Sequence, residues 1–371
     1  MKAYSSLLTI VFTLLSLFAS VCGSAQTDAA EKDTSRLFLF SAYGEGYILY
    51  DLSTPVEFFG GEKTDRHPFI SSYNRNNTPL LNIALLQGKY ISPKFKANIG
   101  LMAGTYATAN MRNEPNVLRY LNEASVSFKL HKSEALWLQA GVMPSHIGFE
   151  SPIGADQLNM TRSIVADNTP YFESGAKLSY EKGRWYAAAL ITNGWQEIVG
   201  PDSTINPSFG HQVMYTRKKW KFNSSSFIGK AYIGLPERGL RIYHNAYAQF
   251  TGEKVSAVIG FDFGFQRIPN TRQMVNWYSP VGVIAVKLSE KTRASARVEY
   301  FNDQHGLVLG NIEKARPAML SGTLGLDFSL APQMMWRLES RWFDARQFIY
   351  RTNNIEYDTN LSFATSLCFR F

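Results

Sequence analysis

This sequence has few cysteines, and its histidines lack the spacing that is typical of a metal site. Its 371 residues include two cysteines, Cys22 and Cys368, and only Cys368 remains if the first 25 residues are removed, as argued below. A single thiol cannot form an internal disulfide. The histidines show no spacing such as two of them four residues apart on one helix, and they stand at His67, His131, His146, His211, His244 and His305. We therefore expect no disulfide framework, no metal site, no cofactor and no cysteine nucleophile.

Long apolar runs are confined to the N-terminus. Lys2 precedes the stretch 7–21, which is apolar apart from Ser and Thr, and small residues follow at 23–25. This is the pattern of a secretory signal peptide that is cut after Ala25. A lipoprotein signal using Cys22 is a rival interpretation, but Val21 stands where a small residue is expected. A retained membrane helix is disfavoured because the apolar core is too short.

After residue 25 the sequence lacks any run of about 18 apolar residues, so no membrane helix is expected. Only 18% of the residues are charged, whereas 14% are aromatic and 27 are glycine. A soluble two-domain enzyme would show more helical periodicity and more charge. The net charge of +8 falls to +7 without Lys2, and the basic residues are dispersed, which argues against nucleic-acid binding. The remaining membrane solution is a closed barrel, whose backbone groups are all paired internally.

The last segment of the sequence alternates as a barrel strand does. Apolar residues dominate the odd positions from Tyr357 to Phe371, and polar residues dominate the even positions from Glu356 to Arg370. A helix would not separate these two sets, because its period is 3.6 residues. The charges on the C-terminal strands share one parity, so we predict that they point into a wet lumen: Arg293, Arg297, Glu299, Arg337, Glu339, Arg341 and Arg370. The opposite parity, with Leu324, Leu326 and Phe363, is predicted to face lipid.

The same test predicts sixteen antiparallel strands in a transmembrane β-barrel of the outer-membrane porin type, an all-β fold. The predicted strands are 36–51, 79–91, 94–109, 119–131, 134–144, 171–180, 184–195, 209–217, 220–230, 241–251, 254–266, 277–288, 292–303, 318–330, 333–345 and 356–371. Short and long connectors alternate strictly, as expected for periplasmic turns and extracellular loops. A soluble β-sandwich is the alternative, which sixteen strands with such uneven connectors disfavour. The domains are a signal peptide (1–25), a polar leader (26–35) and the barrel (36–371).

Several motifs between residues 122 and 196 are similar to those of a known family. They are Asn122-Glu123-Ala124, Gly141-Val142-Met143-Pro144-Ser145-His146-Ile147-Gly148-Phe149-Glu150, Thr161-Arg162-Ser163, Thr169-Pro170-Tyr171-Phe172-Glu173-Ser174-Gly175 and Asn193-Gly194-Trp195-Gln196. The sequence thereby resembles the beta-barrel porin-2 (OmpL-like) family, found largely in Bacteroidota outer membranes. The resemblance implies an outer-membrane location in a Gram-negative bacterium and a pore. It implies neither a substrate nor catalytic residues.

The third long connector, 145–170, is the candidate for a pore constriction. It holds acids and bases that could set a field across a narrowed lumen: His146, Glu150, Asp156, Arg162 and Asp167. Folding of this connector into the lumen is expected by analogy with other 16-stranded porins. The alternative is that Glu150, Arg162 and Asp167 pair with one another or with the wall and only pin the loop.

Two classes of function remain. The first is a passive channel for small hydrophilic solutes, weakly selective and with a mild preference for anions. The second is a barrel without an open pore that serves as a surface anchor, adhesin or assembly component. An enzyme is a third reading for which the sequence gives no positive sign. The expected partners are outer-membrane lipid and the barrel assembly machinery, and a homo-oligomer is left open. The C-terminal residues Phe363, Leu367, Phe369 and Phe371 are predicted to form the assembly signal.

Overall fold

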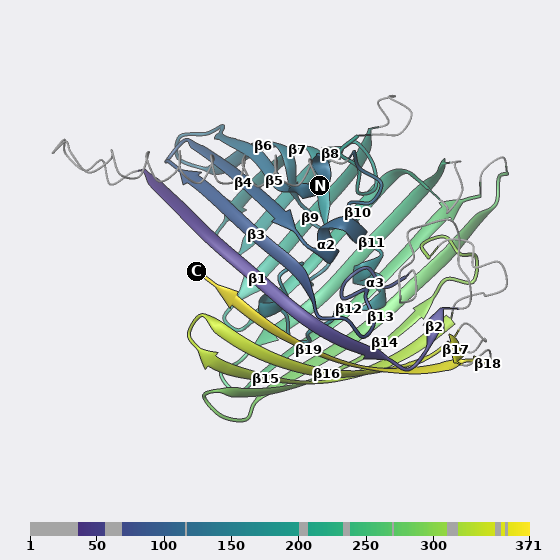
Figure 1. The fold of residues 1–371 in the computed structure, drawn as a ribbon. Coiled ribbons are helices and arrows are strands. Elements are labelled where there is room, and N and C mark those ends of the chain that lie inside the picture. The colour runs from purple at the N-terminus through teal and green to yellow at the C-terminus, as the bar shows by residue number, and fades with distance from the viewer. Residues whose placement is uncertain are drawn as a thin grey trace, which may run out of the picture. The chain divides into compact units, whose positions relative to one another are not determined.

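The wall of the barrel consists of sixteen antiparallel strands that close on themselves, which confirms the predicted fold class (Figure 1). The computed structural model describes residues 36–55, 69–115, 117–199, 207–232, 238–268, 271–309, 318–345, 350–352 and 355–371. The predicted signal peptide and the leader up to residue 35 lie outside the described residues. No helix within the described ranges has the length and apolarity needed to cross a bilayer.

Strands follow one another around the barrel in chain order, as a meander of hairpins does. The wall strands are β1 (Leu37–Asp51), β3 (Leu80–Ile91), β4 (Phe95–Ala103), β5 (Leu121–Lys129), β6 (Ala135–Pro144), β7 (Phe172–Lys182), β8 (Trp185–Thr192), β9 (Ser208–Arg217), β10 (Trp220–Tyr232), β11 (Arg238–Thr251), β12 (Val255–Arg267), β13 (Met274–Lys287), β14 (Thr292–Asn302), β15 (Ala318–Ala331), β16 (Met334–Asp344) and β19 (Thr359–Arg370).

Closure joins the last strand to the first. Purple β1 runs beside yellow β19 in Figure 1, with a register from Tyr43↔Arg370 to Asp51↔Ser362. Because every wall strand then has two neighbours, the barrel has no open edge. The predicted strand 356–371 is divided in the structure. Its first residues form β18 (Ile355–Tyr357), which joins β17 (Tyr350–Thr352) and β2 (Thr54–Pro55) in a small separate sheet.

The predicted strand 94–109 is too long. β4 ends at Ala103, and the helix α2 (Thr105–Asn110) follows it. Gly104 between them has a φ of 116°, and a Cβ at this position would lie 2.4 Å from the carbonyl oxygen of Asn82. Glycine tolerates this conformation and this close approach, so the chain turns away from the wall here. Helix α2 then buries Tyr106 and Ala107 in an apolar cluster with residues of β3 and β4.

The connector predicted at 231–240 is shorter in the structure, although it remains longer than the turns on either side of it. Pairing of β10 with β11 continues as far as Tyr232↔Arg238, so their connector is 233–237. It has the same length as the turn 130–134 at the opposite end of the barrel. The ladder extends beyond the predicted strand ends because strand pairing in three dimensions, and not alternation alone, decides where a hairpin opens.

The interior of the barrel is partly apolar, which differs from the expected wet lumen. Inward side chains of β10 to β16 pack with loop residues in one buried cluster, which includes Phe227, Tyr243, Trp277, Phe301 and Phe343 from the wall. Ile164 and Val165 are among its loop members. Two short helices belong to the connector that supplies these loop residues: η2 (Gly154–Asp156) and α3 (Ile164–Asp167). A 3-10 turn, η1 (Leu118–Tyr120), leads into β5.

Candidate functional site

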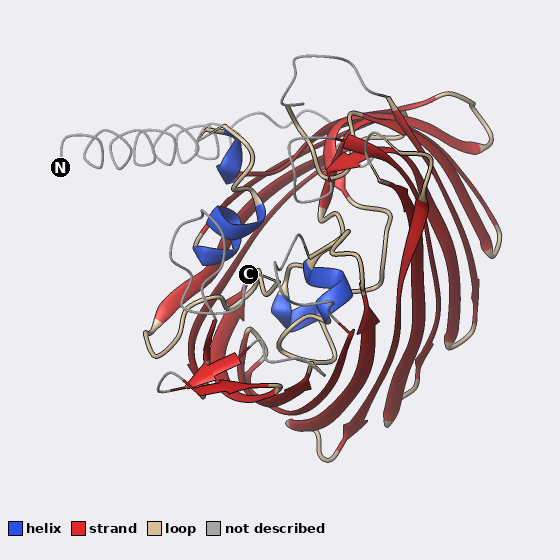
Figure 2. Ribbon diagram, turned by 90° about the vertical axis from the view of Figure 1, so that its right-hand side faces the viewer, coloured by secondary structure: helices blue, strands red, loops and turns tan. Residues whose placement is uncertain are grey.

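The connector 145–171 lies inside the barrel. It leaves the end of β6, contacts the inner face of β14 to β16, and returns to the start of β7. In Figure 1 the label of α3 stands within the barrel, and Figure 2 shows short helices inside the ring of strands. We call this segment the lumen loop. Loops normally run over the surface, because a buried loop must find partners for its backbone polar groups.

Arginines on the inner wall supply hydrogen-bond donors for the carbonyl oxygens of the loop. Four guanidinium groups donate to carbonyl oxygens of the lumen loop. Arg337 donates to Gly154, Arg293 to Gln157 at 2.8 Å, Arg297 to Thr161 at 2.6 Å and Arg341 to Arg162 at 3.0 Å. Because guanidinium donors carry charge, these bonds are stronger than neutral ones.

Two glutamates on the same wall supply the acceptors. Glu339 accepts from the backbone N–H of Met160 at 2.8 Å and of Thr161 at 3.1 Å, and also from the Thr161 hydroxyl. Glu299 accepts from the backbone N–H of Ile164 at 2.6 Å. The wall thus binds the loop mainly through its backbone. We name the residues that do this the docking ladder: Arg293, Arg297, Glu299, Arg337, Glu339 and Arg341.

Ion pairs balance the charge of the docking ladder. Asp327 contacts Arg293 at 2.5 Å and Arg337 at 2.7 Å, and Glu299 contacts Arg341 at 2.6 Å. Glu150 of the lumen loop adds a fourth acid 3.5 Å from Arg297. Most of these side chains are buried, so the parity that was predicted to face water is covered by the loop. Burying a charge is costly unless it is paired and hydrogen-bonded, and each of these groups has an ionic or hydrogen-bonding partner.

His146 fixes the first turn of the lumen loop. Its ring is buried, with Nδ1 2.9 Å from a Glu173 carboxylate oxygen and Nε2 2.8 Å from the carbonyl oxygen of Ser226. Both nitrogens face acceptors, so the geometry suits the doubly protonated imidazolium. Burial works against that charge, but Glu173 and the Ser226 carbonyl outweigh it and raise the pKa of His146 above its ordinary value.

Glu150 and Arg162 hold the middle of the lumen loop. Glu150 accepts from the backbone N–H of Ser163 at 3.1 Å, and burial raises the pKa of Glu150 despite the nearby Arg297. The Arg162 guanidinium lies 3.7 Å from the ring centre of Tyr171 and donates to the Ala166 carbonyl at 2.9 Å. Burial opposes the charge of Arg162, but neighbouring Tyr171 and other groups raise its pKa.

The two remaining constriction candidates lie far apart in the loop. Asp167 is buried and accepts from the hydroxyls of Ser72 at 2.9 Å and Tyr171 at 2.8 Å. Asp156 is partly exposed and pairs with Arg370 at 2.8 Å. The structure therefore brings Glu150, Arg162 and Asp167 together beside the docking ladder, and it places His146 and Asp156 in two separate contacts. These contacts match the alternative in which the charged residues pin the loop.

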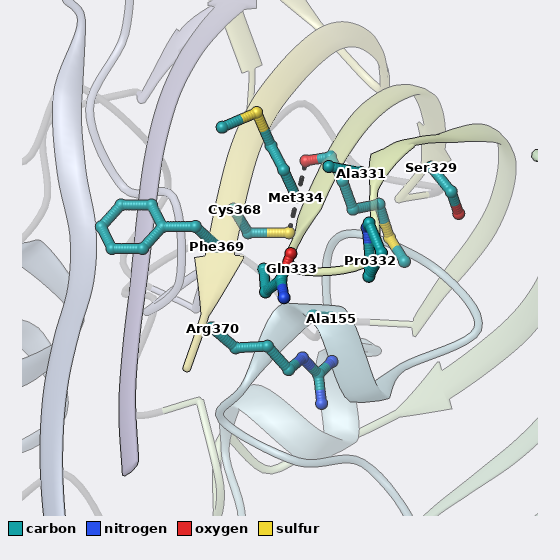
Figure 3. A pocket seen from close by; sticks show the side chains of 10 residues that line it. Ala155, Ser329, Ala331, Pro332, Gln333, Met334, Cys368, Phe369 and Arg370 are labelled. Atoms are coloured by element: carbon teal, nitrogen blue, oxygen red, sulfur yellow. Dashed lines mark hydrogen bonds between the residues drawn. The ribbon is translucent and has the colours of Figure 1, made fainter.

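A pocket of about 280 Å³ lies beside the tip of the lumen loop (Figure 3). Ala155 contributes from the loop, Cys368 and Arg370 from β19, and Gln333 from the turn before β16. The Cys368 thiol is buried and donates to the carbonyl oxygen of Met335 at 3.5 Å. Within the described residues no group of three or more His, Cys, Asp or Glu side chains could hold a metal ion. The pocket thus carries no metal site.

Across the lumen from the docking ladder the wall is basic. Lysines occupy inward positions in the register of β3 to β7 and of β10, and each is half-buried. This lysine wall consists of Lys89, Lys96, Lys129, Lys177 and Lys221. The ammonium of Lys96 lies 4.0 Å from the ring centre of Trp137. Sequence reasoning missed this wall, although the same alternation test, applied to these strands, would have revealed it.

A model of one protein family matches residues 38–371, nearly the whole described barrel; its description reads "Putative beta-barrel porin-2, OmpL-like". A search of the curated proteins found no match.

Several solved structures of bacterial porins and outer-membrane proteins have a similar fold at low sequence identity. The trimer form of OmpT from Vibrio cholerae has a TM-score of 0.60 at 9% identity, covering 91% of this chain and 100% of that one. The channel DcaP of Acinetobacter baumannii has a TM-score of 0.58 at 8% identity, covering 92% and 99%. An anion-selective porin from Comamonas acidovorans has a TM-score of 0.56 at 9% identity, covering 91% and 100%. With a family match over most of its length, this chain belongs to the putative beta-barrel porin-2, OmpL-like family, and it is a porin-like, non-enzymatic barrel of the outer membrane.

Proposed function

We propose that this barrel is an open, weakly selective channel through which small hydrophilic solutes diffuse passively, with a mild preference for anions. The lysine wall is the observation that carries the proposal. Among the described residues, none of its five ammonium groups forms an ion pair, whereas the arginines of the docking ladder all contact a carboxylate or a loop carbonyl. The five lysines therefore place positive charge on the open side of the lumen, which Glu173 and Glu123 offset in part near Lys177.

The electrostatics favour small anions without excluding cations. Charges that line a cleft with low-dielectric walls raise the local concentration of counter-ions. Salt screens this effect within about 8 Å at physiological ionic strength, so a wide pore keeps only a mild preference. The acids of the lumen loop do not cancel the lysine wall, because each faces its own cation: Glu150 lies 3.5 Å from Arg297, Asp156 lies 2.8 Å from Arg370, and Asp167 interacts with Arg162. The loop then narrows the lumen, and its charged residues hold its position.

Reversal potentials across a planar bilayer in a KCl gradient test the proposal. We expect a reversal potential of anionic sign for the purified protein, and a smaller one for Lys89→Gln/Lys96→Gln. Lys132→Gln/Lys291→Gln is the matched control, since it removes the same two charges from exposed turns outside the lumen. A cation preference would contradict the role of the lysine wall.

A barrel without an open pore, used as an anchor, adhesin or assembly component, is the second candidate. The apolar packing inside β10 to β16 favours it, because Trp277, Phe301 and Phe343 fill the interior with buried rings. Absence of any conductance in the bilayer experiment, from protein that is folded and inserted, would support this candidate over the channel.

Export and assembly complete the proposal. Residues 1–25 act as a signal peptide in a Bacteroidota cell, and cleavage leaves the polar leader 26–35; N-terminal sequencing of the membrane-bound protein tests this. Phe363, Leu367, Phe369 and Phe371, which are exposed on the outer face, present the last strand to the assembly machinery. Deletion of Phe371 is expected to reduce the assembled barrel. Association of several copies also fits, since OmpT, one of the similar barrels, is described in a trimer form.

A further inference from the structure

The stem of the lumen loop carries one glycine on each of its two strands, and the two glycines face each other. Gly141 of β6 pairs with Gly175 of β7, and each stands three residues from the loop end of its strand. Their φ angles are 122° and 157°, which side chains rarely allow. A Cβ at Gly141 would lie 2.1 Å from the carbonyl oxygen of Ala124, and a Cβ at Gly175 would lie 2.1 Å from that of Ile191. Both positions therefore require glycine.

The surroundings of β6 and β7 change at the level of these glycines. Towards the short turns, the outward side chains Leu138 and Leu178 are 38% and 43% exposed, as on an ordinary barrel strand. Towards the lumen loop, Val142 and Phe172 occupy positions of the same parity, but they are only 6% and 4% exposed. They belong to one buried cluster with the inward-facing Leu85 of β3. The stem therefore leaves the wall at the glycine pair and enters the lumen.

The connectors that follow β4 and β8 bond to each other beyond the end of this stem. The Gln196 side chain donates to the carbonyl oxygen of Asn110 at 3.0 Å, and Glu114 accepts from the backbone N–H of Ile198 at 2.8 Å. In the wall, β5 to β8 separate the two connectors, so they can meet only across the ends of those strands. We name these four residues the strap: Asn110, Glu114, Gln196 and Ile198.

The strap also contacts the point where the lumen loop rejoins the wall. The side-chain oxygen of Gln196 accepts from the backbone N–H of Tyr171 at 3.0 Å, and Gln196 holds this position with a φ of 59°, which is uncommon outside glycine. The Tyr171 ring meets Tyr106 of α2 edge-on, with 5.2 Å between ring centres, and the Arg162 guanidinium lies over the same ring. Continuous contacts therefore run from the strap through Tyr171 to the middle of the lumen loop.

We infer that Gly141 and Gly175 are positioning residues of the pore: they bend the stem into the lumen, and the strap keeps it bent. The hydrogen bonds of the docking ladder to the loop backbone begin only at Gly154, so the ladder holds the far part of the loop and does not direct the stem. Without the bend, β6 and β7 would continue along the wall and leave a wider lumen opposite the lysine wall. This effect on channel width rests on the proposed function, whereas the position of the loop does not.

Thiol labelling of a buried loop position tests the bend without requiring an open pore. In a Cys368→Ser background, Val165→Cys places one thiol in the buried part of the lumen loop, where maleimide is expected to react slowly. Gly141→Ala/Gly175→Ala is expected to accelerate this labelling about tenfold or more, because backbone strain at both positions favours a stem that has left the lumen. The comparison uses protein whose mobility in unboiled gels is that of the closed barrel.

Two wall glycines supply the matched control. Gly282→Ala/Gly322→Ala adds the same two methyl groups, but the nearest atoms to the new Cβ lie at 4.0 Å and 3.8 Å. This variant is expected to label as slowly as the background. Equal labelling rates in the stem variant and in this control, with both barrels closed, would overturn the inference.

A variant of the strap keeps the inference testable if the stem glycines are needed for assembly. Gln196→Gly removes both side-chain hydrogen bonds and preserves the backbone, because glycine readily adopts a φ of 59°. It is expected to label faster than the background and more slowly than the stem variant. Lys218→Gly is the control, since Lys218 has a φ of 53° at an exposed turn. Labelling of Gln196→Gly at the rate of this control would contradict the role of the strap.

Single-channel conductance in planar bilayers separates the inference from the proposed function. A larger conductance of Gly141→Ala/Gly175→Ala than of Gly282→Ala/Gly322→Ala would support the role of the stem in setting the channel width. Faster labelling with an unchanged conductance would contradict that role. Absence of conductance in every variant would contradict the open channel alone, because the labelling rates would still decide whether the stem positions the loop.

Discussion

The two halves of the barrel wall use charge in opposite ways. On β14 to β16 the docking ladder buries its charges in ion pairs and in bonds to the lumen loop. On β3 to β7 and β10 the lysine wall keeps half-buried ammonium groups that form no ion pair among the described residues. In both regions the charged side chains occupy the strand positions that point into the lumen. The comparison teaches that alternation decides which side chains enter a lumen, and that the loop decides which of them still meet water.

Arg297→Ala is expected to have the largest effect on stability, because it removes a side chain of the buried docking ladder. Arg297 lies between Glu150 and Glu299 and donates to the Thr161 carbonyl. Its removal leaves the buried Glu150 without its ion-pair partner, while Glu299 keeps Arg341 at 2.6 Å; breaking a buried pair in this way typically costs about 3–5 kcal/mol. We expect a lower free energy of unfolding in denaturant titrations and noisier single-channel currents. Arg184→Ala at an exposed turn is the control, and equal losses in both variants would remove the distinction between the halves.

The next largest effect is expected from pH, because two buried groups of the lumen loop titrate differently in the folded barrel. The pKa values of His146 and Glu150 are both raised in the folded barrel. A raised pKa contributes stability that is complete below the ordinary pKa of the group and is lost as pH rises through the folded value. For Glu150 this loss begins above about pH 4.5, and for His146 above about pH 6.5. Thermal unfolding between pH 5 and 9 should therefore show lower stability at the alkaline end, with a weaker dependence in His146→Gln.

A smaller effect is expected where the lumen loop is partly exposed. The Asp156 and Arg370 side chains retain 43% and 48% exposure, so solvent screens their 2.8 Å contact. Exposed pairs contribute about 0–1 kcal/mol. Asp156→Asn should leave the unfolding midpoint nearly unchanged. A loss as large as that of Arg297→Ala would show that the loop tip, and not the docking ladder, holds the loop in the lumen.

The lysine wall should show the smallest effect on stability. Lys96→Glu reverses a charge that lies over the ring of Trp137 and forms no ion pair among the described residues, so we expect a stability change within about 0.5 kcal/mol. The reversal potential should nevertheless move towards cations, because the residue lines the open side of the lumen. A destabilised variant with an unchanged reversal potential would mean that the lysine wall, like the docking ladder, stabilises the fold and does not set the ion preference.

The strands could be predicted because their signal is local. Phe363 and Leu367 alternate with Ser362 and Ser366, and β19 places these two sets on opposite faces. The strand 94–109 failed because apolar and small residues continue past Gly104, whose backbone turns the chain away from the wall. The lumen loop could be singled out by its charged residues. Their partners could not be named, because Glu339 and Arg337 reach the loop from about 180 residues away in the sequence.

By itself, the sequence determined the barrel: sixteen amphipathic segments with period two, the closing strand at the C-terminus, and the inward parity of Arg293, Arg297 and Arg337. Only the tertiary structure decided which inward charges are covered, where Tyr106 and Trp277 are buried, and which connectors meet across the stem of the lumen loop. The physical reason is that alternation follows from the geometry of a single strand, whereas desolvation of a charge depends on whatever the rest of the chain packs against it.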